Sequence, residues 1–95
     1  MEYFVYILIC SDNTYYTGIT TDINRRLMEH NGNGGRNKGA KYTRYRRPVR
    51  LVYSQNFLNR SEASVEESRI KKLPRKEKLA LIESSKSLSK ISLSC

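Results

Sequence analysis

The chain has 95 residues, which fits one domain, and a domain of this length buries only about 60–65% of its unfolded surface. It carries 18 Lys and Arg residues against 9 Asp and Glu residues, a formal net charge of +9. This excess indicates a polyanionic partner and favours nucleic acid over an anionic membrane. No apolar run approaches the roughly 20 residues of a bilayer-spanning helix, and the N-terminal segment lacks the basic start of a signal peptide. We therefore expect a cytoplasmic protein without a membrane segment.

Cysteine and histidine are too few to build a metal site of the zinc type. Cys10 lies in an apolar run and Cys95 is the last residue, so a disulfide would have to join a core strand to a loose chain end. We expect both thiols to be reduced. Two cysteines and one histidine, far apart in the chain, fall short of a structural zinc set. Any metal ion would be held mainly by oxygen ligands.

The N-terminal segment predicts a β-hairpin. Residues 3–10, YFVYILIC, are almost wholly apolar and rich in aromatic and β-branched types, which is typical of a buried strand. Asp12 and Asn13 supply the turn, and residues 15–19 then return as an antiparallel strand. This pairing would bring Tyr6 close to the tyrosine pair that opens the second strand.

A short helix is expected after the hairpin. Thr20 or Thr21 can cap its first turn, and Ile23 and Leu27 recur at the i, i+4 spacing of an apolar helix face. The helix should end near Gly32, where the sequence changes to glycine-rich.

A loop and a third strand follow. Residues 32–44, GNGGRNKGAKYTR, contain four glycines and little apolar content, so we expect a mobile loop. Residues 48–54, PVRLVYS, predict a strand in which Val49, Leu51 and Tyr53 alternate and point inward together.

Two helices complete the domain. Asn59 and Glu62 resemble a capping pair at the start of the second helix, and Pro74 interrupts that helix and suits the first position of the third. The serine-rich residues 85–95 are weakly patterned and predict a disordered tail. Residues 1–84 therefore form one α+β domain with the order strand, strand, helix, strand, helix, helix.

Four polar side chains of the hairpin and the first helix can converge. Arg26 and His30 lie one helical turn apart and about 40° from each other, beside the apolar stripe. Tyr6 and Tyr16 lie across the hairpin, so their hydroxyls reach the same edge if both side chains share a sheet face. Each residue alone is an ordinary core or surface residue. Together they would place two phenols, a guanidinium and an imidazole around one point.

The same stretches resemble the GIY-YIG nuclease superfamily. FVY at residues 4–6 and YTG at residues 16–18 are similar to its paired signature, with Phe4 in place of the first glycine. The resemblance continues through TGITTDINRRLMEHN, where Arg26 takes the position of the family's helix arginine, and through SEASVEESRIKKL. It covers residues 3–83 and is strongest for the small stand-alone bacterial branch, often called YhbQ-like.

This resemblance implies a fold and a reaction. The fold is α+β, a three-stranded antiparallel sheet flanked by three helices. The reaction is hydrolysis of phosphodiester bonds in DNA with a divalent cation, Mg²⁺ or alternatively Mn²⁺. Arg26 would neutralise charge that grows in the transition state. Tyr6 is the first choice as general base, Tyr16 would position phosphate or water, and His30 is a rival of Tyr6 for proton transfer.

The metal-binding glutamate has two candidates on the second helix. The apolar stripe of Ala63 and Ile70 places Glu66 nearer its middle, whereas ESRIKKL aligned with the small bacterial branch selects Glu67. We expect Glu67 to be the metal ligand. The other carboxylate would then pair with a basic neighbour at helical spacing.

Basic and aromatic residues near the centre of the chain predict a nucleic-acid surface. Their cations can contact phosphates and their rings can stack on exposed bases. A smaller basic cluster surrounds the end of the second helix. The candidate residues are Arg36, Lys38, Lys41, Tyr42, Arg44, Tyr45, Arg46, Arg47, Lys71 and Lys72.

Two functional hypotheses fit these residues. The first is a small metal-dependent DNA endonuclease that acts in DNA repair or processing. The alternative is a DNA- or RNA-binding domain that kept the fold after losing its activity. A basic protein-interaction module is the weakest reading, because it leaves Tyr6, Tyr16, Arg26 and Glu67 unexplained.

Overall fold

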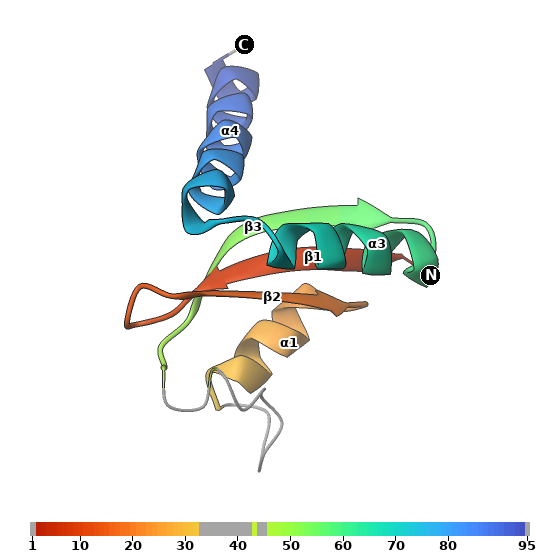
Figure 1. The fold of residues 1–95 in the computed structure, drawn as a ribbon, viewed down its shortest axis with the longest axis vertical. Helices are drawn as coiled ribbons and strands as arrows, with labels where there is room; N and C mark the ends of the chain where they lie inside the picture. Colours follow the sequence, from red (N-terminus) through yellow and green to blue (C-terminus); the bar gives the residue numbers. More distant parts are fainter. Residues whose placement is uncertain (1, 33–42, 44–45, 95) are drawn as a thin grey trace.

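The computed structural model of the protein describes residues 2–32, 43 and 46–94. Within these residues three strands and three helices follow in the predicted order. They are β1 (Tyr3–Ile9), β2 (Tyr15–Thr20), α1 (Ile23–His30), β3 (Arg50–Phe57), α3 (Arg60–Lys71) and α4 (Arg75–Ser94). The strands form one antiparallel sheet in the order β2-β1-β3, which confirms the predicted α+β fold (Figure 1).

β1 lies at the centre of the sheet because its side chains are apolar on both faces. Figure 1 shows α1 and α3 on opposite faces of the sheet. Val5 and Ile7 pack on the α3 face, and Tyr6 and Leu8 pack on the α1 face; none of the four is more than 2% exposed. A strand buried on both faces reads as a continuous apolar run, as this one does.

The sheet therefore separates two small cores. The α3-side core consists of Val5, Ile7, Tyr53, Ala63, Ile70 and Ile82. The α1-side core consists of Tyr6, Leu8, Cys10 and Val49, with Tyr16, Leu27 and Leu51 packed against it. Cys10 is a buried free thiol, as expected, whereas Cys95 lies outside the described residues. The tyrosines of the predicted site thus belong to the α1-side core.

The turn between β1 and β2 has the predicted chemistry. Asn13 adopts a left-handed conformation with φ 66°, which asparagine tolerates better than most residues. Its N–H donates to the carbonyl of Cys10 at 2.9 Å, and the Asp12 carboxylate accepts from the Thr14 N–H and hydroxyl at 3.2 and 2.6 Å. These bonds fix the hairpin register in which Tyr6 lies opposite Gly18.

The prediction that Val49, Leu51 and Tyr53 share one face is wrong. Tyr53 pairs with Ile7 and Leu51 pairs with the next residue of β1, so Val52 is an extra residue in a β-bulge. Val49 and Leu51 consequently pack in the α1-side core, and Tyr53 packs in the α3-side core. The bulge reverses the alternation that the sequence pattern assumed.

The helix caps agree with the sequence in one case and differ in the other. Asn59 caps α3, and its side chain accepts from the N–H of Glu62 at 2.9 Å, as predicted. The cap of α1 is Asp22, which accepts from the N–H of Arg25 at 3.0 Å, and not a threonine. Thr20 instead accepts from the N–H of Asp22 at 3.1 Å and so orients the capping residue.

The last helix, α4, begins directly after Pro74. Pro74 precedes α4, and its carbonyl accepts from the N–H groups of Glu77 and Lys78 at 3.0 and 3.1 Å. α4 then continues to Ser94 across the segment predicted to be disordered. Residues 75–94 contain neither glycine nor proline, so nothing in the backbone ends the helix earlier. No helix of the described residues is long and apolar enough to cross a membrane.

Replacing Ile70 by alanine should destabilise the protein strongly. Ile70 is 0% exposed in the α3-side core, and deleting a buried side chain of this size costs about 2–5 kcal/mol. Val65→Ala is the control, because Val65 lies on the same helix and is 71% exposed. Urea unfolding of both variants measures the difference. Equal midpoints for Ile70→Ala and Val65→Ala would contradict the packing described here.

Candidate active site

Tyr6 lies across β2 because Gly18 leaves room for its ring. The two residues are directly opposite in the hairpin. A Cβ atom on Gly18 would lie 2.6 Å from the Tyr6 hydroxyl oxygen and 2.8 Å from the ring carbon that bears it. Real Cβ contacts are not so short, so any other residue at this position would displace the hydroxyl. The glycine of YTG is therefore a packing requirement of the tyrosine on the neighbouring strand.

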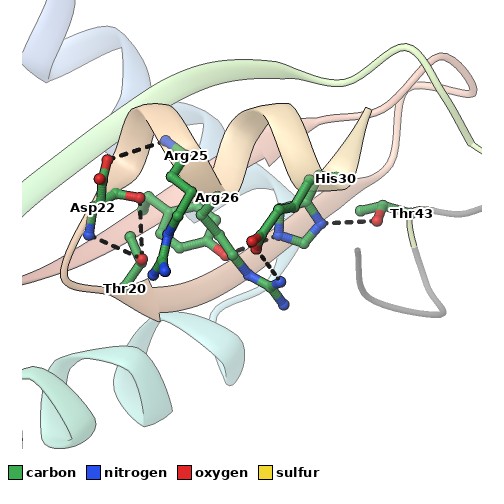
Figure 2. A network of polar contacts seen from close by, with 8 residues as sticks. Thr20, Asp22, Arg25, Arg26, His30 and Thr43 are labelled. Carbon is green, nitrogen blue, oxygen red and sulfur yellow. Dashed lines mark hydrogen bonds and ion pairs between the residues drawn. The ribbon is translucent and has the colours of Figure 1, made fainter. Parts of the chain in front are cut away.

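His30 joins Tyr6 to the distant Thr43. Its Nε2 is 2.9 Å from the Tyr6 hydroxyl and its Nδ1 is 2.8 Å from the Thr43 hydroxyl. Both His30 and Thr43 are 0% exposed. Figure 2 shows the His30 ring at the end of α1 with its bond to Thr43. Three residues from β1, α1 and the segment before β3 thus form one buried polar chain.

The histidine of this chain is neutral at pH 7. Burial, and then the nearby positive charges of Arg26 and Arg47, lower the pKa of His30 from 6.5 to about 4. A neutral imidazole has one donor nitrogen and one acceptor nitrogen. Both nitrogens of His30 have hydroxyl partners, which can donate or accept as required. The chain satisfies both nitrogens without placing a charge in the α1-side core.

The Tyr16 ring packs against the His30 imidazole. The centroids of the Tyr16 and His30 rings are 4.9 Å apart at an interplanar angle of 60°, and those of Tyr16 and Tyr6 are 6.3 Å apart. Such tilted contacts stabilise aromatic pairs beyond their buried area. Tyr16 is half-buried whereas Tyr6 is only 2% exposed, so Tyr16 is the phenol nearer to solvent.

Arg26 places a positive charge beside the tyrosines. Its guanidinium forms an ion pair with Glu29 at 3.0 Å, and it lies close enough to Tyr6 for the two side chains to interact electrostatically. Burial acts against the charged form of Arg26, but Glu29 and the nearby Tyr6 raise its pKa overall. Burial, followed by the nearby Tyr16, raises the pKa of Tyr6 well above its ordinary value, although Arg26 opposes this shift. Tyr6 is therefore a neutral phenol in the structure.

The two candidate glutamates act electrostatically on different tyrosines. Both oxygens of Glu66 accept from Arg69 at 2.7 Å, which lowers the pKa of Glu66, and its charge affects Tyr53 of the α3-side core. The charge of Glu67 instead contributes to the raised pKa of Tyr6, after burial and Tyr16. Its carboxylate has a looser contact, 3.3 Å, with Lys71. Of the two, Glu67 is therefore the carboxylate whose charge reaches Tyr6.

The residues around Tyr6 suit a metal ion that is also bound by water and by substrate oxygens. Within residues 2–32, 43 and 46–94, no three His, Cys, Asp or Glu side chains are grouped to hold a metal. Mg²⁺, however, keeps several waters and often binds through one or two carboxylates together with substrate phosphate oxygens. Glu67, with a side chain 23% exposed, suits such a shared site and does not suit a site made of protein ligands alone.

The predicted nucleic-acid residues fall into two groups. Arg36, Lys38, Lys41, Tyr42, Arg44 and Tyr45 lie outside the described residues. Arg46 is paired with Asp12 at 3.0 Å, and Arg47 donates from Nε to the backbone carbonyl of His30 at 2.6 Å. Lys71 and Lys72 are exposed at the end of α3. Arg46 and Arg47 thus have structural partners that the sequence did not suggest.

Thr43 and Glu29 complete the site and were missed by sequence reasoning. Thr43 lies 13 residues beyond His30 in a glycine-rich stretch, and no local pattern marks it as a partner of the imidazole. Glu29 follows Arg26 at i, i+3, and this spacing is a signal that could have identified the ion pair.

Comparisons with known proteins identify the family of the chain. The family model described as the GIY-YIG catalytic domain matches residues 2–80. A UPF0213 protein of Desulfotalea psychrophila is 53% identical over 83 residues, covering 87% of this chain and 73% of that protein. A UPF0213 protein of Oceanobacillus iheyensis is 51% identical over 82 residues, covering 86% and 91%.

Two solved structures have the same fold. The solution NMR structure of a UPF0213 protein from Bacillus halodurans is 44% identical, with a TM-score of 0.55 over 87% of this chain and 84% of that one. The solution NMR structure of a protein from E. faecalis is 42% identical, with a TM-score of 0.60 over 88% and 85%. The similarity therefore includes sequence and backbone.

The buried histidine should make stability depend on pH. The unfolded chain binds a proton at His30 near pH 6.5 and the folded chain only near pH 4, so stability is highest above pH 6.5 and falls as the pH drops toward 4. The full difference, reached below pH 4, corresponds to about 3 kcal/mol. Urea unfolding between pH 7 and 5 should show about 2 kcal/mol of it, and His30 is the only histidine.

His30→Gln is the control for this measurement, because glutamine retains a donor and an acceptor but does not titrate in this range. The slope of stability against pH between 7 and 5 should disappear in the variant. An unchanged slope would show that another group is responsible.

Proposed function

Because the chain belongs to the GIY-YIG catalytic-domain family, a nuclease superfamily, we propose that it hydrolyses phosphodiester bonds in DNA with a divalent metal ion. The observation that carries the proposal is the convergence of Tyr6, Tyr16, Arg26 and His30 at one point, with Glu67 within electrostatic range of Tyr6. The net charge of +9 suits a polyanionic substrate. A role in DNA repair or processing is part of the same proposal.

In this proposal Tyr6 and His30 act as a pair, with Tyr6 as the base and His30 as the acceptor of its proton. Arg26 lies near Tyr6 and can only donate, so the Tyr6 oxygen presents a lone pair toward Arg26 and directs its hydrogen to Nε2 of His30. In this tautomer Nδ1–H donates to Thr43. The Tyr6 oxygen then takes a proton from the attacking water while its own proton passes to Nε2.

The charges around the pair change when a phosphate arrives. Tyr6 is 2% exposed, so water reaches its hydroxyl after Arg26 turns from Tyr6 toward a phosphate oxygen. A phosphate anion next to Arg26 also offsets the positive field that disfavours protonated His30. Water oxygen bonds to phosphorus, the bond to the leaving oxygen breaks, and that oxygen takes a proton from solvent. His30 then releases the proton on Nε2 to solvent, which restores the neutral pair. Tyr16, the phenol nearer to solvent, orients the phosphate.

Glu67 is the proposed ligand for Mg²⁺, with Mn²⁺ as the alternative. When bound, the ion would polarise a non-bridging phosphate oxygen and neutralise charge that develops there. Lys71 lies 3.3 Å from the Glu67 carboxylate, and its exposed side chain could turn away when a cation binds.

A nucleic-acid-binding domain without turnover is the second candidate. It is favoured by one observation, the burial of Tyr6 and His30, which leaves little of either side chain accessible. Cleavage of labelled DNA and RNA substrates in the presence of Mg²⁺ or Mn²⁺ distinguishes the two. Binding without cleavage of any of them would favour the second candidate.

Tyr6→Phe should reduce cleavage about 100-fold or more, since it removes only the hydroxyl from the proposed proton path. DNA affinity should remain unchanged. Tyr15→Phe is the control, because Tyr15 is on the same hairpin but packs against the α3-side core. Single-turnover cleavage and a binding titration separate the two quantities. Similar rates for both variants would remove Tyr6 from the chemistry.

Glu67→Gln should abolish metal-dependent cleavage and leave the fold intact, because a neutral amide is a poor ligand for a hard cation. Metal-free DNA affinity should stay the same or increase slightly, since a negative charge is removed beside the phosphate. Glu66→Gln is the matched control on the adjacent residue and should retain most of the activity. Rates measured against Mg²⁺ concentration test both, and the reverse order would make Glu66 the ligand.

A further inference from the structure

A polar groove adjoins the tyrosine site at the end of the sheet where α1 and α3 begin. It has a volume of about 470 Å³ and is lined by the end of β2, one side of α1 and the first residue of α3. Its charged groups are Arg25, Arg26, Arg60 and Glu29. Glu29 is paired with Arg26, so the two remaining arginines give the groove a net positive charge.

The side chains of Arg25 and Arg60 have no partner among the residues that the structure describes. Within the described part of the chain, neither side chain forms a hydrogen bond or an ion pair, although both are exposed arginines beside a polar groove. Figure 2 shows the Arg25 and Arg26 side chains extending in the same direction from α1. Two guanidinium groups with free donors therefore face a space that is large enough for a phosphate group.

Both arginines add positive charge at the N-terminal end of a helix. Arg25 lies in the first turn of α1, and Arg60 is the first residue of α3. Helix N-termini carry partial positive charge, which the Asp22 carboxylate at the α1 cap and Glu62 in the first turn of α3 offset in part. Both helices begin at the same end of the sheet, on the right in Figure 1. An anion in the groove can therefore contact two arginines that come from different helices.

Arg26 connects the groove with the tyrosine site. It lines the groove, and its charge acts on Tyr6. A strand whose scissile phosphate lies at Tyr6 and Arg26 continues directly into the groove, because a nucleic-acid strand carries a phosphate at every nucleotide. We propose that Arg25 and Arg60 bind a phosphate of the same strand, next to the scissile one, and thereby fix the direction of the substrate across the site.

This inference rests on the proposed nucleic-acid function but not on turnover, so its test is done without metal. The probe is a short, fluorescein-labelled single-stranded oligothymidylate in EDTA, titrated with the full chain at several salt concentrations. Arg25→Gln and Arg60→Gln should each weaken binding about tenfold at low salt and make the salt dependence shallower by about 0.7 in log–log slope. Arg50→Gln is the matched control, since Arg50 pairs with Ile9 at the opposite end of the sheet.

The same samples allow a local measurement. In ¹⁵N-labelled protein the Nε–H resonances of Arg25 and Arg60 should shift on addition of the oligonucleotide, and the Nε–H resonance of Arg50 should stay in place.

Equal losses of affinity for Arg25→Gln, Arg60→Gln and Arg50→Gln would overturn the proposal and leave only diffuse charge attraction. A specific effect at Arg25 and Arg60 supports the groove even if no substrate is cleaved, whereas cleavage with no specific effect refutes the groove and leaves the nuclease function standing.

Discussion

The hydrogen bond between Tyr6 and His30 connects the core of the fold with the candidate active site. Tyr6 belongs to the central strand, so its hydroxyl has a fixed position, and Gly18 allows that position on the neighbouring strand. His30 ends α1 and is held on its other nitrogen by Thr43. A buried histidine without both partners would leave an unsatisfied polar nitrogen in the α1-side core. The same two bonds therefore stabilise the helix against the sheet and assemble the proposed proton path.

Adjacent residues of α3 have different surroundings. Its Ala63 and Ile70 are buried in the α3-side core. Glu66 is held by Arg69 and stays near Tyr53, whereas Glu67 affects Tyr6. One residue step on a helix is a rotation of about 100°, which is enough to separate a structural carboxylate from a candidate ligand. The two glutamates differ in their surroundings because of this rotation and not because of residue type.

Local patterns predicted the parts of the structure that depend on local physics. The apolar run of residues 3–10, the Asn13 turn and the Asn59 cap were all visible in the sequence, because each depends on neighbouring residues. Thr43 was not, since its partner lies 13 residues away and is set by tertiary packing. The α1 cap was assigned to the wrong residue because three adjacent polar side chains compete for it. The roles of the site residues came from family resemblance and stay predictions.

Because of the bulge at Val52, the packing of β3 depends more on the number of its residues than on the residue type at position 52. Val49 and Leu51 contact one core, and Tyr53 contacts the other, only because one residue is left without a partner between them. Most apolar residues could stand at position 52, but a deletion there would turn one half of the strand inside out. Homologous chains should therefore vary freely in residue type at position 52 but hardly at all in the number of residues of β3. An insertion or deletion at this position would identify a protein whose α1-side core is rearranged.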